Sequence, residues 1–121
     1  MRLLVIFISC LIVLSGCGQP SKHILVQNQY VPKPGKENEV YILRLHASDV
    51  LAKLGLQKGR VLKRPQLSDR PYVMWECEYS SMNEREMDVA KVSKSEEFKK
   101  IEDHMGTLVD SFERVTWEVE D

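Results

Sequence analysis

The alternation of apolar and polar residues along the chain predicts four β-strands. Residues 24–31, 60–64, 72–79 and 112–120 are short runs with β-branched or aromatic residues, set off by Pro, Gly, Ser and Asp. In the third and fourth runs the side chains alternate in character, which is typical of a strand with one buried face.

A repeat of apolar residues at intervals of three and four predicts a long helix that begins near Lys36. The helix spans about five turns, and Gly55 followed by Leu56 suits a left-handed helix stop with its hydrophobic contact. Its apolar stripe consists of Val40, Leu43, Ala47, Val50, Leu51 and Leu54.

Two further helix starts are indicated by the capping-box spacing, in which a serine precedes a glutamate by three residues. Ser81 with Glu84 and Ser93 with Glu96 have this spacing. Helices are therefore predicted to begin near residues 82 and 94. The second of them carries an apolar stripe made of Phe98, Ile101, Met105 and Leu108.

The predicted order is strand, helix, strand, strand, split helix, strand, which is the βαββαβ arrangement of the α+β ferredoxin-like fold. Residues 24–121 contain no linker long enough to divide them, so one domain is expected. The sheet face under the helices is predicted to carry Val73, Trp75, Cys77, Val115, Trp117 and Val119. The opposite face is then predicted to carry Tyr72, Met74, Glu76, Glu78, Phe112, Arg114, Thr116 and Glu118.

The beginning of the chain has the layout of a secretory signal. Arg2 precedes an apolar run of about a dozen residues, fewer than the ~20 that span a bilayer. Residues 14–17, Leu-Ser-Gly-Cys, resemble the lipobox of bacterial lipoproteins, in which the cysteine is acylated. The resemblance implies a signal peptide at 1–16, lipidation of Cys17 and a short tether over 17–23. The domain is then expected in the cell envelope, lipid-anchored to a membrane on its extracytoplasmic side, and Gly18 implies the outer membrane in a Gram-negative organism.

Charge and cysteine content narrow the function classes. The 17 Lys and Arg residues are balanced by 18 Asp and Glu residues, so no nucleic-acid partner is expected. Cys77 is the one cysteine that lies in the domain, and a buried, space-filling role is expected for it. The three histidines and this thiol lack zinc-ligand spacing, so no metal is expected.

Three segments of the domain carry a further resemblance: Pro34-Gly35-Lys36, the strand from Trp75 to Tyr79, and the tail. The tail contributes Glu97, Phe98, His104, Met105, Gly106, Thr107, Leu108, Phe112, Glu113, Arg114, Trp117, Glu118 and Val119. With the element order, these segments resemble the dimeric α/β-barrel superfamily, which contains antibiotic-biosynthesis-monooxygenase-like and NIPSNAP-like domains. The resemblance covers about residues 24–119. It implies a homodimer whose two four-stranded sheets pack face to face, with helices outside and a pocket between the sheets.

Haem-degrading members of that superfamily use an Asn in the first strand, a Trp before the last helix and an iron-binding His on that helix. Aligning their helix start with residues 95–98 places Val92 at the Trp position and Glu102 at the His position. Asn28 alone matches, so no haem and no other cofactor is expected. His104, two positions beyond Glu102, is kept as a weaker candidate.

The predicted candidate pocket consists of Asn28, Tyr72, Glu76 and Arg114. On the predicted face, Arg114 could clamp an acidic ligand, and Glu76 and Glu78 have the residue type of acid–base catalysis. The alternative is an ion-paired, partly solvated face at the dimer seam. His104 near a helix end suits a favourable charge–dipole role there, and His46 is predicted to face solvent.

The sequence therefore predicts a lipid-anchored envelope protein whose dimeric domain binds a small apolar or aromatic ligand, or a partner protein. The alternative is a cofactor-independent monooxygenase-like enzyme that acts on a small aromatic substrate, based on the family resemblance and on Glu76 and Arg114. A third possibility is a structural role in which the domain dimerises and organises other envelope proteins.

Overall fold

The computed structural model describes residues 22–67 and 70–120, and these residues form a four-stranded antiparallel sheet and three helices. The strand order is β2-β3-β1-β4, so β1 and β3 are central and β2 and β4 are edges. The elements are β1 (Ile24–Pro32), α1 (Glu37–Lys53), β2 (Arg60–Lys63), β3 (Val73–Tyr79), α2 (Met82–Val92), α3 (Glu96–Leu108) and β4 (Val109–Glu118). The predicted ferredoxin-like βαββαβ fold with a split second helix is confirmed.

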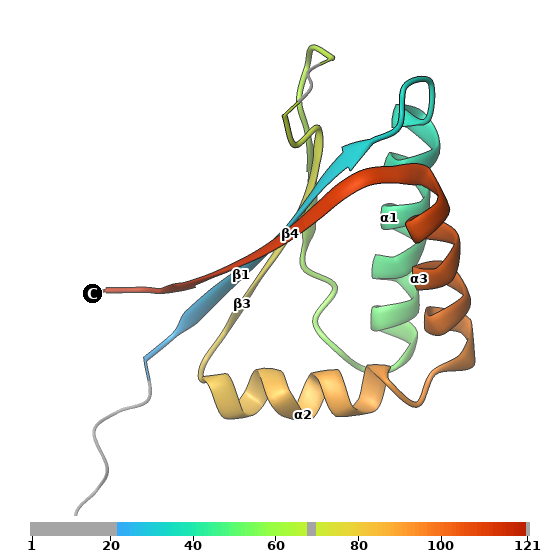
Figure 1. Ribbon diagram of the computed structural model, residues 1–121. Helices are drawn as coiled ribbons and strands as arrows, with labels where there is room; N and C mark the ends of the chain where they lie inside the picture. Colours follow the sequence, from blue (N-terminus) through green and yellow to red (C-terminus); the bar gives the residue numbers. More distant parts are fainter. Residues whose placement is uncertain (1–21, 68–69, 121) are drawn as a thin grey trace, which may run out of the picture.

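Helices α1 and α3 lie side by side and cover one face of the sheet. Helix α2 runs across one end of this pair of helices (Figure 1). The core lies between this face and the helices. As predicted, Val73, Trp75 and Cys77 of β3 point into it, and Ile24 and Val26 of β1 join them, all less than a tenth exposed. None of the helices in the described residues is long and apolar enough to span a membrane.

The face assignment predicted for the last strand is wrong. Arg114 pairs with Asn28, and Trp117 pairs with Leu25. Directly paired residues of antiparallel strands share a face, and Asn28 is on the buried, helix-covered side of β1. Arg114 therefore lies on the helix-covered face, and Trp117 lies on the opposite one. Phe112, Thr116 and Glu118 share the face of Arg114, and Val115 shares the face of Trp117, so the whole strand is reversed relative to the prediction.

The helix ends follow local chemistry. Gly55 has the positive φ, +76°, of a left-handed stop, and the Leu56 amide donates to the Leu51 carbonyl oxygen at 3.0 Å, as predicted after α1. Ser81 caps α2, since its side chain accepts from the Glu84 amide at 3.1 Å.

The predicted cap of the last helix is two residues too early. Ser93 ends α2, where its hydroxyl donates to the Ala90 carbonyl oxygen at 2.7 Å. Ser95 caps α3 instead by accepting from the Phe98 amide at 3.1 Å. The helix then continues through Gly106 to Leu108, and β4 begins three residues before the predicted start of the last strand.

Two glycines in opposite environments give a test of the packing. At Gly59, φ is +64°, and an added Cβ would meet the Trp75 indole nitrogen and lie 2.7 Å from the Glu76 carbonyl oxygen. Gly106 lies in α3 with open space around the site of a Cβ. We expect Gly59→Ala to lower the free energy of unfolding by about 1–3 kcal/mol through strain and overpacking. Gly106→Ala should raise it by about 0.5–1 kcal/mol.

Urea titration of both variants measures these changes. A Gly59→Ala protein as stable as the parent would contradict the close approach of β3 to the segment before β2.

Candidate ligand-binding cavity

A cavity of about 530 Å³ lies between the helix-covered face of the sheet and the three helices. The sheet contributes residues from β1, β3 and β4, and each helix contributes part of the wall. Its lining is mainly apolar and aromatic, with a few charged and amide groups. The lining residues include Val26, Asn28, Tyr30, Arg44, Ala47, Gln57, Trp75, Tyr79, Arg85, Asp88, Val89, Glu102, Gly106, Phe112 and Arg114.

Aromatic rings form much of the sheet side of the cavity. Tyr30 of β1 and Phe112 of β4 are cross-strand partners whose ring centroids lie 5.2 Å apart at an interplanar angle of 53°. Trp75 is fixed on β3 because its indole N–H donates to the Lys58 carbonyl oxygen at 3.0 Å. Burial raises the pKa of the Tyr30 phenol and the pKa of the Tyr79 phenol, so both rings stay neutral at physiological pH.

Asn28 and Arg114 form a polar pair on this aromatic face. The Arg114 Nε donates to the Asn28 Oδ1 at 2.9 Å, and the guanidinium carbon lies 5.4 Å from the centre of the Phe112 ring. Asn28 is buried, whereas Arg114 is exposed. The buried Asn28 amide is thus hydrogen-bonded to an exposed arginine at the cavity margin. This pair places polar groups beside the apolar surface of the cavity.

Arg44 is the most unusual charged group in the cavity wall. It comes from the middle of α1, is 3% exposed, and its guanidinium carbon lies 4.8 Å from the centre of the Trp75 ring. Among the described residues it forms no ion pair and no hydrogen bond through Nε, which is buried. Burial lowers the pKa of Arg44 from its ordinary value. A buried cation without a paired anion is costly, and the ring contact offsets about 2 kcal/mol of that cost.

Two carboxylates also line the cavity, from the side of α2 and α3. Asp88 lies on α2 and Glu102 on α3, and burial raises the pKa of Asp88. Neither forms an ion pair with Arg44 within the part of the chain that the structure describes, although Glu102 exerts a weak electrostatic effect on it. The two carboxylates therefore lie on other walls of the cavity than Arg44, which comes from α1.

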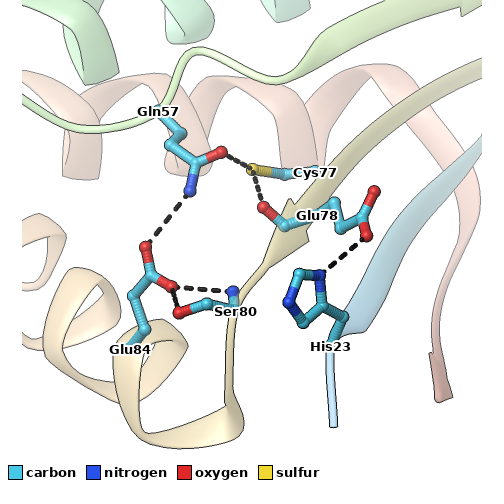
Figure 2. Close-up of polar contacts among 6 residues, drawn as sticks. All are labelled: His23, Gln57, Cys77, Glu78, Ser80 and Glu84. Carbon is cyan, nitrogen blue, oxygen red and sulfur yellow. Dashed lines mark hydrogen bonds and ion pairs between the residues drawn. The ribbon is translucent and has the colours of Figure 1, made fainter. Parts of the chain in front are cut away.

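A hydrogen-bonded group that includes the lining residue Gln57 connects the segment after α1 with β3 and the start of α2. Figure 2 shows Gln57 between the Cys77 thiol and the Glu84 carboxylate, with contacts of 3.7 Å and 3.3 Å. Glu84 in turn accepts from the Ser80 amide at 2.7 Å. Cys77 is free and buried, in agreement with the predicted space-filling role, and burial raises its pKa, so the thiol is held protonated.

The structure does not bring the four predicted pocket residues together. Asn28 and Arg114 share the cavity, but Glu76 lies on the opposite face of the sheet, where it is paired with Arg60 and accepts from Gln27 Nε2 at 3.1 Å. Tyr72 also lies on that face, where it borders a shallower hollow of about 490 Å³. The predicted combination of Glu76 with Arg114 is therefore wrong, because the pairing of β4 with β1 puts them on different faces.

The histidines lie away from the cavity. His104 is exposed on α3 and is not part of the lining, so it has no contact with the candidate site. His46 is about half exposed and lies 3.7 Å from Glu97, in agreement with the predicted solvent-facing position. No group of His, Cys, Asp and Glu residues suited to a metal ion occurs in the described segments.

Sequence reasoning missed Arg44. The signal is its place on the helix: Arg44 follows Val40 by four residues and precedes Ala47 by three, so it falls on the buried stripe. A charged residue inside an apolar stripe needs either a partner or a functional reason.

Solved structures of known proteins show what this arrangement is similar to. A NIPSNAP family protein from Agrobacterium tumefaciens superimposes with a TM-score of 0.66 at 16% identity, over 85% of this chain and 90% of that one. A dimeric ferredoxin-like protein of unknown function from Bacteroides fragilis gives 0.61 at 14% identity, over 80% and 96%. A mutant form of SnoaB, a cofactor-independent oxygenase from Streptomyces nogalater, gives 0.62 at 14% identity, over 84% and 96%.

These similarities establish the fold. The predicted resemblance to NIPSNAP-like and monooxygenase-like domains is thereby supported for the domain architecture. No protein-family model matches the sequence, and no curated protein is detectably similar to it. Function has to be argued from the cavity itself.

Proposed function

We propose that the domain is a binding module that takes a small, mainly apolar or aromatic molecule into the cavity between its sheet and helices. The observation that carries the proposal is the cavity of about 530 Å³, within the usual size of small-molecule sites. Its lining combines aromatic rings with a few convergent polar groups, which is the composition typical of such sites. The proposal puts the binding site inside each chain, whereas the resemblance implied a pocket between the sheets of two chains.

The oxygenase alternative lacks the residue pair on which the sequence-based argument depended. Glu76 and Arg114 do not share a cavity, and Glu76 is already occupied by Arg60 and Gln27. SnoaB supports the same fold for this chain, and a shared fold does not transfer an activity. Binding without chemistry is therefore the function that the cavity supports best.

A neutral apolar fluorophore, N-phenyl-1-naphthylamine, tests the cavity. We expect saturable fluorescence enhancement with the parent protein. Gly106 lines the cavity and has open space at the site of a Cβ, so Gly106→Trp should obstruct the cavity and weaken binding about tenfold or more, a loss of ~1.4 kcal/mol. Gly106→Ala is the matched control and should bind as the parent does. Absence of saturable binding to the parent would refute the proposed function.

We also propose that two chains pair through the sheet face that the helices leave uncovered. Trp117 is 54% exposed there, and its indole N–H donates to the Gln27 Oε1 at 3.0 Å. The same face carries further half-buried apolar residues, namely Leu25, Leu62, Met74 and Val115. The Bacteroides fragilis protein of similar fold is dimeric. A two-fold pairing of such faces would bury the same tryptophan in both chains.

Sedimentation equilibrium tests the dimer. Trp117→Arg places a charge in the proposed interface of each chain, so we expect it to shift the protein to monomer. Met87→Arg, on an exposed position of α2, is the control and should leave the mass unchanged. A monomeric parent protein, or a Trp117→Arg dimer as stable as the parent, would exclude this interface.

A lipid anchor at Cys17 is the third part of the proposal. Cys17 and the signal at 1–16 lie outside the described residues, as does most of the tether at 17–23. The described structure starts just before β1, where the Val119 amide donates to the His23 carbonyl oxygen at 2.9 Å. Only residues 18–22 would separate this sheet end from the lipid. An extended chain spans ~3.5 Å per residue, so the domain would lie close to the headgroups.

Metabolic labelling with radioactive palmitate tests the anchor. We expect label in the parent protein and none in Cys17→Ser, because the thiol is the site of acylation in this proposal. Cys10→Ser is the control and should keep the label. Equal labelling of the parent and Cys17→Ser would exclude Cys17 as the anchor.

A further inference from the structure

We propose that the ligand of the cavity is an aromatic carboxylate whose negative charge pairs with Arg44. The inference deepens the proposed binding function and depends on it. Its basis is a cation that is 97% removed from solvent, lies in the wall of a cavity large enough for a ligand, and has no anionic partner among the described residues.

The chemistry of Arg44 selects the ligand group. A guanidinium presents planar N–H donors that match the two oxygens of a carboxylate. The guanidinium carbon lies over the Trp75 ring, 4.8 Å from its centre, and an aromatic ring supplies no carboxylate oxygen for the N–H donors. The Nε has no hydrogen-bond partner in the described part of the chain, so the donors of the guanidinium are not all satisfied there.

The rest of the cavity selects the body of the ligand. Tyr30 and Phe112 form a tilted ring pair on the sheet, and Val26 and Ala47 add apolar surface. Flat aromatic molecules gain both area burial and ring contacts in such surroundings. A carboxylate on an aromatic body therefore satisfies the charge and the apolar lining at once.

Other charges in the lining do not replace such a ligand. Asp88 and Glu102 border the cavity, yet neither pairs with Arg44. Arg114 is exposed and already bonded to Asn28, so its charge is solvated rather than buried. Arg85, on α2, is the third cation of the lining and the alternative binding partner for the carboxylate.

The test compares two probes of nearly the same shape, 1-naphthoate and neutral 1-naphthamide, by calorimetric titration of the parent and of variants. We expect the parent to bind the acid about tenfold or more tightly than the amide. Arg44→Met should erase this preference while it keeps binding of the amide. Arg44→Lys, which keeps the charge and loses the planar fork, should retain only part of the preference. Lys53→Met removes a charge from an exposed position of the same helix and should leave the preference intact.

A second readout does not require a ligand. Removal of an unpaired buried charge should raise the Tm of the unliganded protein, by about 4 °C or more for Arg44→Met. Lys53→Met should leave the Tm nearly unchanged. A purely structural role for Arg44 predicts the opposite, a lowered Tm in Arg44→Met.

The outcomes separate the inference from the binding function. Equal affinity for the acid and the amide would overturn the inference and leave the binding function standing. A preference for the acid that persists in Arg44→Met would also overturn it, because Arg85 or Arg114 would then bind the carboxylate. If N-phenyl-1-naphthylamine does not bind the parent, the proposed function falls and the inference falls with it.

Discussion

The pairing of β1 with β3 on one side and β4 on the other decides which side chains of this domain can meet. Asn28 stands opposite Trp75 in β3 and opposite Arg114 in β4, so these three share the helix-covered face. The next residue, Gln27, stands opposite Glu76 and belongs to the other face. A shift of one residue in either pairing would exchange the two sets. The polar chemistry of the sheet is thus divided into two groups that cannot cooperate directly, one inside the cavity and one on the uncovered surface.

The sequence predicted elements well where one side of a pattern was clearly apolar. In β3, Trp75 and Cys77 alternate with Glu76 and Glu78, so the apolar pair identifies the core-facing side. The apolar stripe of α1 likewise identifies one side of the helix. In β4 both alternating sets contain large apolar residues, Phe112 in one and Trp117 in the other. The strand is an edge with no fully buried residue, so burial could not choose between them. Only the hydrogen-bonded register with β1 settles the phase, and a register is a long-range property that local periodicity does not encode.

The same limit explains the candidate site. Asn28 and Arg114 were among the predicted pocket residues and do share the cavity. The prediction also placed Glu76 beside them, which would require Arg114 to lie on the opposite face of β4. Arg44 was missed because an arginine on a helix usually extends its head to water past an apolar stem. Here Trp75 on the sheet covers the guanidinium, and only the packing of α1 against β3 reveals that the charge is buried. The protein keeps a costly group in its interior, which is the pattern expected where stability is exchanged for binding.

The cavity lies within one chain, so the proposed ligand binding does not depend on the proposed pairing of two chains. The uncovered sheet face contributes no residue to the lining, since Gln27, Glu76 and Trp117 all lie outside it. Pairing of two such faces would therefore leave each cavity complete. Helix α2 is the least tightly packed wall of the cavity. It has no buried residue, although Arg85, Asp88 and Val89 belong to the lining. Its position depends on its serine cap and on the Gln57–Glu84 contact at its start. Elements with few buried contacts open at the lowest free-energy cost, so we expect α2 to open more readily than the other walls of the cavity.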